Sequence, residues 1–183
     1  MSYAIATNEC TLTDLKAFRG GAVEAGIARA LRLAIASDRE ELVVLESLPV
    51  TNFPGAWTTE QYITPAPAAV GWAWAGDGAA VGVLPVGQVA VFYKCANSSA
   101  VVPPVFIGTR FRIGATGAST KAVFMFQLEI ENKMESDVYF SEPVVYDPND
   151  NANIQVYSTA AAGAAENVSY GCFIIMRLGA EVS

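Results

Sequence analysis

The feature that most constrains this chain is an almost uncharged middle third. Between Ser47 and Thr109 there are only three charged residues, Glu60, Asp77 and Lys94. Soluble globular proteins usually carry about one charged residue in four. Much of this stretch is therefore expected to be covered by protein, either by other parts of the same chain or by a neighbouring subunit.

The composition of the whole chain limits the classes of protein to which it can belong. Its 183 residues fit one domain with a single core. The net charge of −7 repels a phosphate backbone, so no direct nucleic-acid partner is expected. No window reaches the roughly 18 uncharged apolar residues of a membrane span, and the N-terminus lacks the basic and apolar regions of a secretory signal. We expect synthesis in a cytoplasm and no membrane partner.

Residues 1–40 are predicted to form an N-terminal arm that belongs to the same unit as the rest. Thr11–Arg19 predicts a short helix that begins at Thr11 or Thr13 and ends at Gly20-Gly21. Residues 22–36 fit both a helix and a strand, because their larger apolar residues share one helical arc and are also all odd-numbered. The alanine and leucine content favours the helix. The helical arc contains Val23, Ile27, Leu31 and Ile35 with Ala30 and Ala34, and the odd-numbered set adds Leu33 to the four larger residues.

The clearest strand signal is a pair of alternating segments, Val105–Ile113 and Lys121–Glu131. Each segment places apolar residues on one side and polar or charged residues on the other, as a half-buried strand does. Matching the two apolar faces in a hairpin brings Phe111 near Phe124 and Ile107 near Leu128, because a slip of one residue would invert the faces.

Residues 41–183 as a whole predict an all-β domain. Short apolar runs separated by glycine and proline turns give about eight to nine strands, which is typical of a sandwich or a jelly roll. The run Tyr170–Leu178 is apolar at nearly every position, so this strand is expected to be buried on both faces. We therefore expect an all-β sandwich or jelly-roll-like domain with a short N-terminal helical arm.

Four aromatic residues of the charge-poor stretch are candidates for a binding role. They are open to three interpretations: ordinary core packing, contact between subunits, and stacking on sugars. Tryptophan is enriched at the energetic centres of protein interfaces, which makes the second interpretation a specific one. The candidate subunit-contact residues are Phe53, Trp57, Trp72 and Trp74.

No set of residues in the sequence indicates catalysis or a metal. The chain has no histidine, which removes the commonest general base and a leading metal ligand. Glu129 and Glu131 are open to two interpretations, a glycosidase pair or a solvated strand face. The loop Asp147–Asn153 offers oxygen ligands for calcium, or else a turn built by Asp and Asn side chains. We assign no catalytic residue, no cofactor and no metal, and expect a protein that is not an enzyme.

The three cysteines, Cys10, Cys95 and Cys172, are odd in number and far apart. They suggest neither a disulfide framework nor a metal site with paired cysteines. We expect them to pack as small apolar side chains.

Three segments resemble the structural proteins of virions: VVPPVFIGTRFRIGA, KAVFMFQLEIENK and NVSYGCFIIMRLGAEV. The resemblance is to coat subunits and to the decoration or cement proteins of phage heads. It implies a β-sandwich or jelly-roll subunit of a bacteriophage or other viral capsid, forming a homo-oligomer such as a trimer and contacting other capsid subunits. The contacts would involve the N-terminal arm and Ser47–Thr109.

The resemblance also implies a place in the particle. The protein would be located in the virion after synthesis in the host cytoplasm. The sequence has no concentrated basic segment to face a packaged genome, which favours an outer, accessory position. The alternative function is a carbohydrate-binding module of a fibre or secreted assembly that uses Trp57, Trp72 and Trp74.

Overall fold

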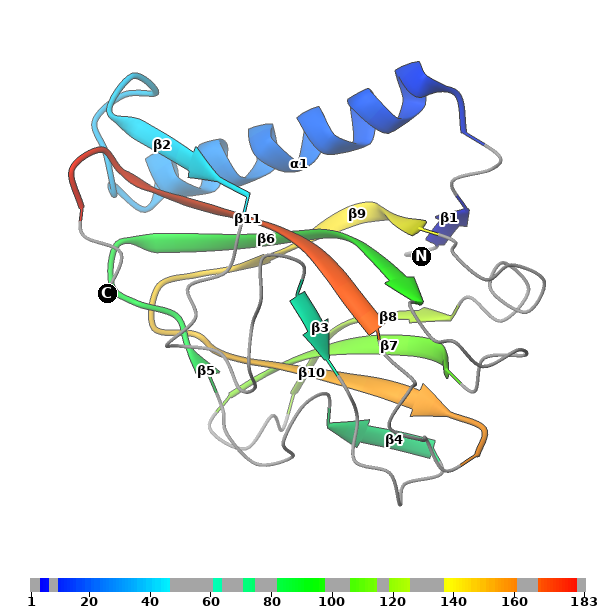
Figure 1. The fold of residues 1–183 in the computed structure, drawn as a ribbon. Helices are drawn as coiled ribbons and strands as arrows, with labels where there is room; N and C mark the ends of the chain where they lie inside the picture. The colour runs from blue at the N-terminus through cyan, green and yellow to red at the C-terminus, as the bar shows by residue number, and fades with distance from the viewer. Residues whose placement is uncertain are drawn as a thin grey trace.

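In the computed structural model, one helix lies across a stack of two antiparallel β-sheets (Figure 1). The structure describes residues 4–6, 10–46, 61–63, 71–74, 82–97, 106–114, 119–125, 137–160 and 168–180. Strand β1 (Ala4–Ala6) comes first and helix α1 (Leu12–Arg32) follows it. The predicted β-sandwich with an N-terminal helix is confirmed.

In each sheet, two short strands lie one after the other along the same edge of one long strand. The six-stranded sheet has the order β1, β9, β6, β11, with β2 and β3 both along the far edge of β11. The five-stranded sheet has the order β8, β7, β10, with β4 and β5 both along the far edge of β10. The bounds are β2 (Leu42–Leu45), β3 (Gln61–Ile63), β4 (Gly71–Trp74), β5 (Gly82–Val83), β6 (Gln88–Asn97), β7 (Phe106–Ile113), β8 (Ser119–Met125), β9 (Asp137–Tyr146), β10 (Asn151–Ser158) and β11 (Val168–Arg177).

The strands pair in a nested pattern that defines the topology. β7 pairs with β8, β6 with β9, β4 and β5 with β10, and β2 and β3 with β11. Successive pairs alternate between the two sheets, which is the strand order of a jelly roll. Counting the shared positions once, the described strands fill eight jelly-roll positions, and β1 adds a ninth at the edge of β9.

The predicted hairpin is formed by β7 and β8. Phe111 and Phe124 are both buried, and their rings meet edge to face with centroids 6.2 Å apart, as the matched apolar faces predict. Ile107 is also buried on this side. Its predicted neighbour, Leu128, lies outside the described residues.

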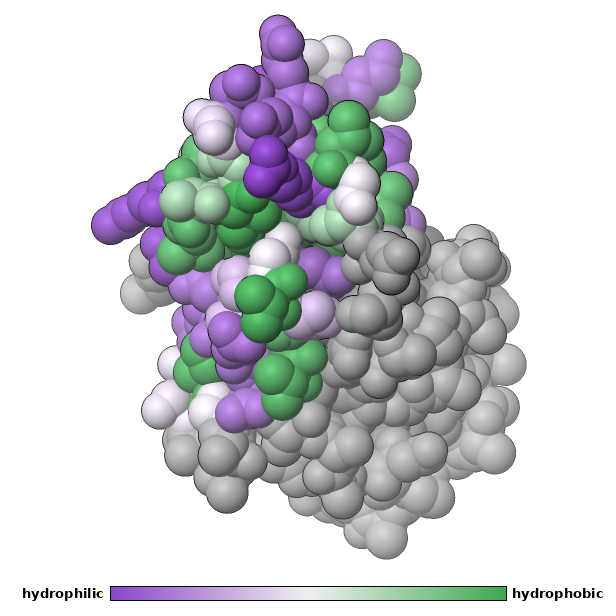
Figure 2. All heavy atoms as spheres, turned by 90° about the vertical axis from the view of Figure 1, so that its left-hand side faces the viewer, coloured by the Kyte–Doolittle hydropathy of each residue, from purple (hydrophilic) through white to green (hydrophobic). Residues whose placement is uncertain are grey.

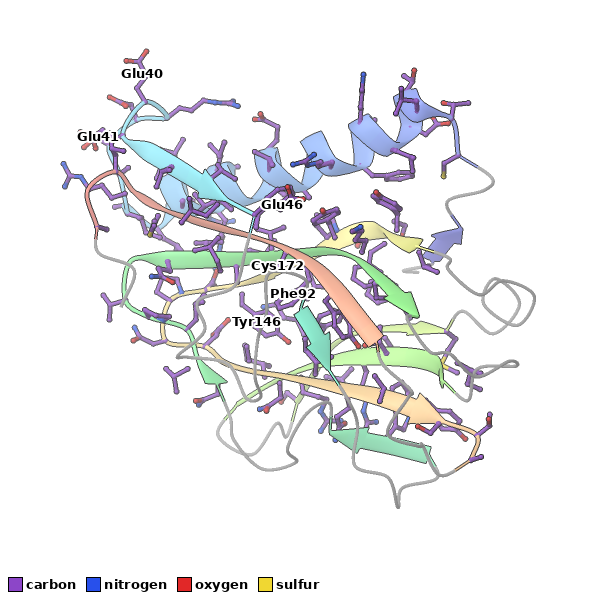
Figure 3. The ribbon with its side chains drawn as sticks, in the orientation of Figure 1. Glu40, Glu41, Glu46, Phe92, Tyr146 and Cys172 are labelled. Atoms are coloured by element: carbon purple, nitrogen blue, oxygen red, sulfur yellow. The ribbon has the colours of Figure 1, made fainter. Side chains whose placement is uncertain are left out.

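The main core lies between the two sheets. Figure 3 shows Phe92, Tyr146 and Cys172 pointing into this space. Three buried hydroxyl groups of this core have partners: the Tyr146 hydroxyl donates to the backbone oxygen of Arg112 at 2.9 Å, and the hydroxyl oxygens of Thr109 and Tyr170 lie 2.6 Å apart. Elsewhere on β10, the buried hydroxyl of Ser158 has no hydrogen-bond partner among the described residues. The core is therefore mainly apolar packing with a few polar groups.

A second core lies between the six-stranded sheet and α1. Along β11, Cys172 and Ile174 face the inter-sheet core, while Phe173 and Ile175 face the helix. The predicted burial of this strand on both faces is confirmed. The helix side of this second core consists of Ala22, Ile27 and Ala30, with the sheet side supplied by Val89, Val91, Tyr93, Tyr139, Phe173 and Ile175.

Helix α1 is longer than predicted. Thr11 caps it in a capping box with Asp14, whose backbone N–H donates to Thr11 Oγ1 at 3.2 Å. The predicted end at Gly20-Gly21 is wrong, because the helix continues through both glycines to Arg32. The strand interpretation of residues 22–36 is also wrong. Two helical glycines cost roughly 1 kcal/mol each relative to alanine, and burial of the helix face against the sheet offsets that cost.

Three arginine–carboxylate pairs connect the helix layer to its surroundings. Arg19 pairs with Glu46 just after β2, and Arg39 in the turn after the helix pairs with Glu24. Arg29 binds Asp147 through two nitrogens, with Nε 2.7 Å from Oδ1. Because Asp147 lies in the turn between β9 and β10, this last pair ties the helix to a connection between the two sheets.

Substitution of the helical glycines tests the packing of α1 on the sheet. A Cβ at Gly26 would clash with Ile175 and would lie 2.7 Å from Val91 Cγ2, whereas a Cβ at Gly20 would meet nothing within 4 Å. We expect Gly26→Ala to lower the free energy of unfolding by about 1–3 kcal/mol through overpacking. Gly20→Ala is the matched control and should raise it by up to about 1 kcal/mol. Urea denaturation measures both, and a stabilising Gly26→Ala would contradict the packing described.

The Arg29–Asp147 pair predicts a loss of stability in acid. Hydrogen bonds from Arg29 lower the pKa of the Asp147 carboxyl below its ordinary value. The pair therefore stabilises the fold above the unfolded pKa of about 4, and this contribution is lost as the pH falls through the lower folded value. We expect Asp147→Asn to cost about 1–2 kcal/mol at neutral pH and to flatten the decline in acid.

The control for this experiment is Glu142→Gln, since Glu142 pairs with no arginine among the described residues. Urea denaturation over a pH series measures both variants. Parallel acid profiles for Asp147→Asn and the unmodified chain would show that the pair contributes nothing.

Candidate functional site

The candidate site lies on the outer face of the five-stranded sheet. Along β10, Ala152, Ile154 and Val156 point into the core, so Gln155 and Tyr157 point outward. Arg110 of β7 also points outward, opposite Gln155 in the ladder. This face is on the side of the molecule away from α1, which covers the other sheet (Figure 1).

Trp72, Tyr157 and Arg110 form a contiguous group on this face. The ring of Trp72 meets that of Tyr157 edge to face, with centroids 5.3 Å apart. The guanidinium carbon of Arg110 lies 4.4 Å from the centroid of the Trp72 ring, within the range of a cation–π contact. Arg110 Nε donates to Oε1 of Gln155 at 2.5 Å. The guanidinium is therefore held by both a ring and an amide.

Two exposed apolar side chains extend the group onto the edge strand β8. Val123 lies opposite Arg110 in the ladder and is 40% exposed, and Met125 lies opposite Gly108 and is 50% exposed. A Cβ at Gly108 would lie 2.6 Å from Met125 Sδ, so the missing side chain leaves room for Met125 between the strands. We call Trp72, Arg110, Val123, Met125 and Tyr157 the aromatic–arginine face.

The charge of Arg110 is not balanced by a neighbouring carboxylate among the described residues. Burial, and then the repulsion of nearby Arg112, lower the pKa of Arg110 below its ordinary value. By contrast, carboxylates raise the pKa of Arg29 and of Arg39. Arg110 is therefore a partly buried cation, and no described residue provides a carboxylate to balance its charge.

Of the four candidate contact residues, the structure places two. Trp72 and Trp74 lie on β4, opposite Tyr157 and Gln155 respectively, and the Trp72 side chain belongs to the aromatic–arginine face. Phe53 and Trp57 lie outside the described residues. Sequence reasoning missed Arg110, Met125 and Tyr157 as members of the face. The alternation of apolar and polar residues along β7 and β10 indicates that Arg110 and Tyr157 point outward. No sequence signal shows that β4 lies next to β10.

The loop Asp147–Asn153 is a turn held by its own polar groups. The backbone N–H of Asp147 donates to Asp150 Oδ2 at 2.8 Å, and Asn149 adopts the left-handed conformation with φ 63°. The Asp147 carboxylate binds Arg29, and Lys121 Nζ lies 3.9 Å from Asp150. The turn interpretation is confirmed, and within the described residues no group of three or more metal-ligating side chains occurs.

A hollow of about 320 Å³ lies at the edge of the sandwich between β8 and β9. Arg29, Lys121, Glu142 and Asp147 line it, over a floor that includes Phe124. Arg29 and Asp147 pair with each other, so much of its charge is already balanced. Glu129 and Glu131, the predicted alternative for catalysis, lie outside the described residues.

The two cysteines of the core have little reactivity because they are buried. Cys95 and Cys172 are buried and Cys10 is partly exposed, and none of the three forms a disulfide. Burial raises the pKa of the Cys172 thiol far above its ordinary value, which removes its reactive thiolate form. The expected packing of Cys95 and Cys172 as small apolar groups is confirmed.

We expect a thiol reagent such as DTNB to modify Cys10 alone in the folded chain and all three cysteines in denaturant. Release of the coloured product, followed by absorbance, measures the number of reactive thiols. In the control variant Cys10→Ser, the folded chain should not react within the same time. A second fast-reacting thiol in this variant would contradict the burial of Cys95 and Cys172.

Comparison with known proteins does not assign the chain to a family or a function. No protein-family model matches the chain, and neither the curated proteins nor the solved structures contain a match. Within the described part of the chain, no helix is both long and apolar enough to span a membrane.

Proposed function

We propose that this chain is a non-enzymatic structural subunit of a viral or phage particle. It acts as a capsid-associated decoration, cement or coat protein that stabilises the shell through subunit contacts. In this proposal the aromatic–arginine face is the surface through which copies associate, and other capsid subunits are further partners. The chain reaches the virion after synthesis in the host cytoplasm.

The observation that carries the proposal is the difference between the two outer faces of the sandwich. Helix α1 covers the outer face of the six-stranded sheet. On the five-stranded sheet, Trp72, Arg110 and Tyr157 point outward and are half-buried, and Met125 on the edge strand is 50% exposed, whereas Gln155 at the centre of this face is buried. Aromatic residues, methionine and arginine are the types enriched in protein interfaces. This composition favours a protein partner over a solvated surface.

The size of the face suits such a contact. Neighbouring strands are about 4.8 Å apart and residues about 3.4 Å apart along a strand, so four positions of about seven residues cover roughly 450 Å² before side-chain relief is added. Standard interfaces bury about 800 Å² per partner. Gln155 and Asn153 on this side of β10 are buried, so only part of that extent is open to a partner. The face can therefore form part of one interface, and repetition over a shell would multiply its effect.

The fold agrees with a capsid role but does not by itself establish that role. Jelly-roll sandwiches occur in viral capsid proteins and also in lectins, and a fold alone does not define a function. The net charge of −7 favours an outer position on the particle over contact with the packaged genome.

The second candidate function is a carbohydrate-binding module of a fibre or secreted assembly. The position of Trp72 and Tyr157 on one outer sheet face favours it, because aromatic rings can stack on sugars. Arg110 already lies over the Trp72 ring, which leaves less of that ring for a sugar. We therefore rank this candidate second.

Oligomeric state tests the main proposal. We expect mass photometry and sedimentation velocity to find a trimer or larger homo-oligomer, and Trp72→Ala to raise its dissociation constant by at least about tenfold, since interface tryptophans often contribute 2 kcal/mol or more. The control is Val86→Ala, which removes an 80% exposed apolar side chain in the turn between β5 and β6. A wild-type monomer at micromolar concentration would refute the proposal.

A glycan array separates the two candidates. Binding of a neutral or acidic glycan by the unmodified chain, with loss of binding in Trp72→Ala at unchanged melting temperature, would favour the carbohydrate module. The structural proposal expects no glycan signal from the unmodified chain above that of Trp72→Ala.

A further inference from the structure

The hollow between β8 and β9 is bordered by an irregular stretch of each strand. The ladder of β8 with β7 shifts register between Phe111 and Arg112, which leaves Lys121 as an extra residue without a partner in β7. A β-bulge of this kind turns the extra side chain away from the regular alternation, and such bulges are frequent next to active sites. Lys121 lines the hollow, so the bulge directs its ammonium group there.

The opposite wall of the hollow has a second irregularity, in β9. The ladder of β9 with β6 passes from Val144 directly to Tyr139, so residues 140–143 bulge from that ladder. Glu142 and Pro143 belong to this bulge and also line the hollow. Proline has no backbone N–H to donate, and within sheets it is tolerated at bulges. The two bulges therefore bring a cation and a carboxylate to one hollow from strands of different sheets.

Neither of these two charges has a strong partner among the described residues. Lys121 Nζ lies 3.9 Å from Asp150 Oδ2, which is beyond hydrogen-bond length, and its side chain is 30% exposed. Glu142 is exposed, and its carboxylate forms no ion pair with Lys121 or with another described residue. By contrast, Arg29 and Asp147 of the same lining are bound to each other. The hollow therefore has two opposite charges that a ligand can contact.

The charges and the size of the hollow indicate the class of ligand. Its two cations and two carboxylates balance, so an ion of either sign would face groups of its own charge as well as opposite ones. A zwitterion can place its carboxylate at Lys121 and its ammonium group at Glu142, with charge-assisted hydrogen bonds at both ends. The volume of about 320 Å³ is at the small end of ligand sites, and Pro143 and Val145 add apolar surface for a short side chain.

We propose that this hollow binds a free α-amino acid with a small apolar side chain, held as a zwitterion between Lys121 and Glu142. The bound amino acid joins β8 of one sheet to β9 of the other and stabilises the folded sandwich by mass action. The site shares no residue with the aromatic–arginine face, and it does not depend on the proposed shell contact.

The exposed apolar side chains at one end of the molecule are less suited to a ligand. Leu33, Val86 and Leu178 are exposed at the end that faces the viewer in Figure 2, where hydrophobic and hydrophilic residues of the described part are interspersed. Scattered apolar residues of this kind are normal on a solvated surface. The hollow differs from this end because it combines a concave shape with two opposite charges.

Matched ligands test whether both charges are needed. L-valine, isovalerate and isobutylamine share one branched side chain, but isovalerate lacks the ammonium group and isobutylamine lacks the carboxylate. Titration of the isotope-labelled chain, followed by heteronuclear NMR, measures the dissociation constant and identifies the residues whose amide signals shift. We expect L-valine to bind with a dissociation constant on the order of 1 mM and to shift the signals of Lys121 and Glu142. Each of the other two compounds should bind at least about tenfold more weakly.

Substitutions test which residues hold the amino acid. Lys121→Met and Glu142→Gln each remove one charge at similar side-chain size, so each should raise the dissociation constant for L-valine by at least about tenfold. Lys121→Arg keeps the charge and should retain binding. Lys16→Met and Glu40→Gln make the same changes at exposed positions outside the lining and should bind as the unmodified chain does. The melting temperature without ligand shows that each variant is folded, and with L-valine it should rise for the unmodified chain and the two controls.

The outcomes separate the inference from the proposed function. Isovalerate or isobutylamine binding as tightly as L-valine would overturn the zwitterion site in favour of a simple ion site. A titration with L-valine that shows no saturable shift below about 10 mM, or equal binding by Lys121→Met and Glu142→Gln, would also overturn it. These results leave the structural role intact, because subunits can associate with or without a bound amino acid. A wild-type monomer that binds L-valine through Lys121 and Glu142 would support the site and refute the proposed function.

Discussion

The structure depends on the burial of one sheet on both of its faces. Strands β6 and β11 send alternate side chains into the inter-sheet core and into the layer beneath α1, so a single sheet supports two hydrophobic cores. Phe92 and Cys172 face one core, whereas Tyr93 and Phe173 face the other. This arrangement needs near-continuous apolar strands, because a polar residue on either side would be buried without a partner. The helix is therefore part of the fold and does not act as a free arm.

Because α1 covers only one of the two sheets, the outer faces of the two sheets differ. The helix covers one outer face, and the opposite face presents rings, a methionine and an arginine whose charge has no described counter-ion. The proposed contact with other subunits depends on this difference between the two outer faces.

Local sequence patterns predicted some elements well. The alternation around Phe111 and Phe124 indicated the β7–β8 hairpin and its facing, and the unbroken apolar run around Ile174 indicated a strand buried on both sides. The same reasoning ended the helix at Gly20, where local propensity is poor. It could not include the packing of Ala22 and Ile27 on a sheet formed much later in the chain. Tertiary burial outweighed the local preference.

The sequence by itself determined the class of fold, because period-two alternation and turn residues are properties of short segments. It also predicted that the charge-poor stretch is covered by protein, and among the described residues of that stretch Val89, Ala90, Val91, Phe92 and Tyr93 are buried. Only the tertiary structure decided which strands are neighbours, and hence that Trp72, Tyr157 and Arg110 meet on one face. These residues lie on three strands that are distant in sequence. Their contact is set by the nested pairing of the whole sandwich, and no local pattern encodes it.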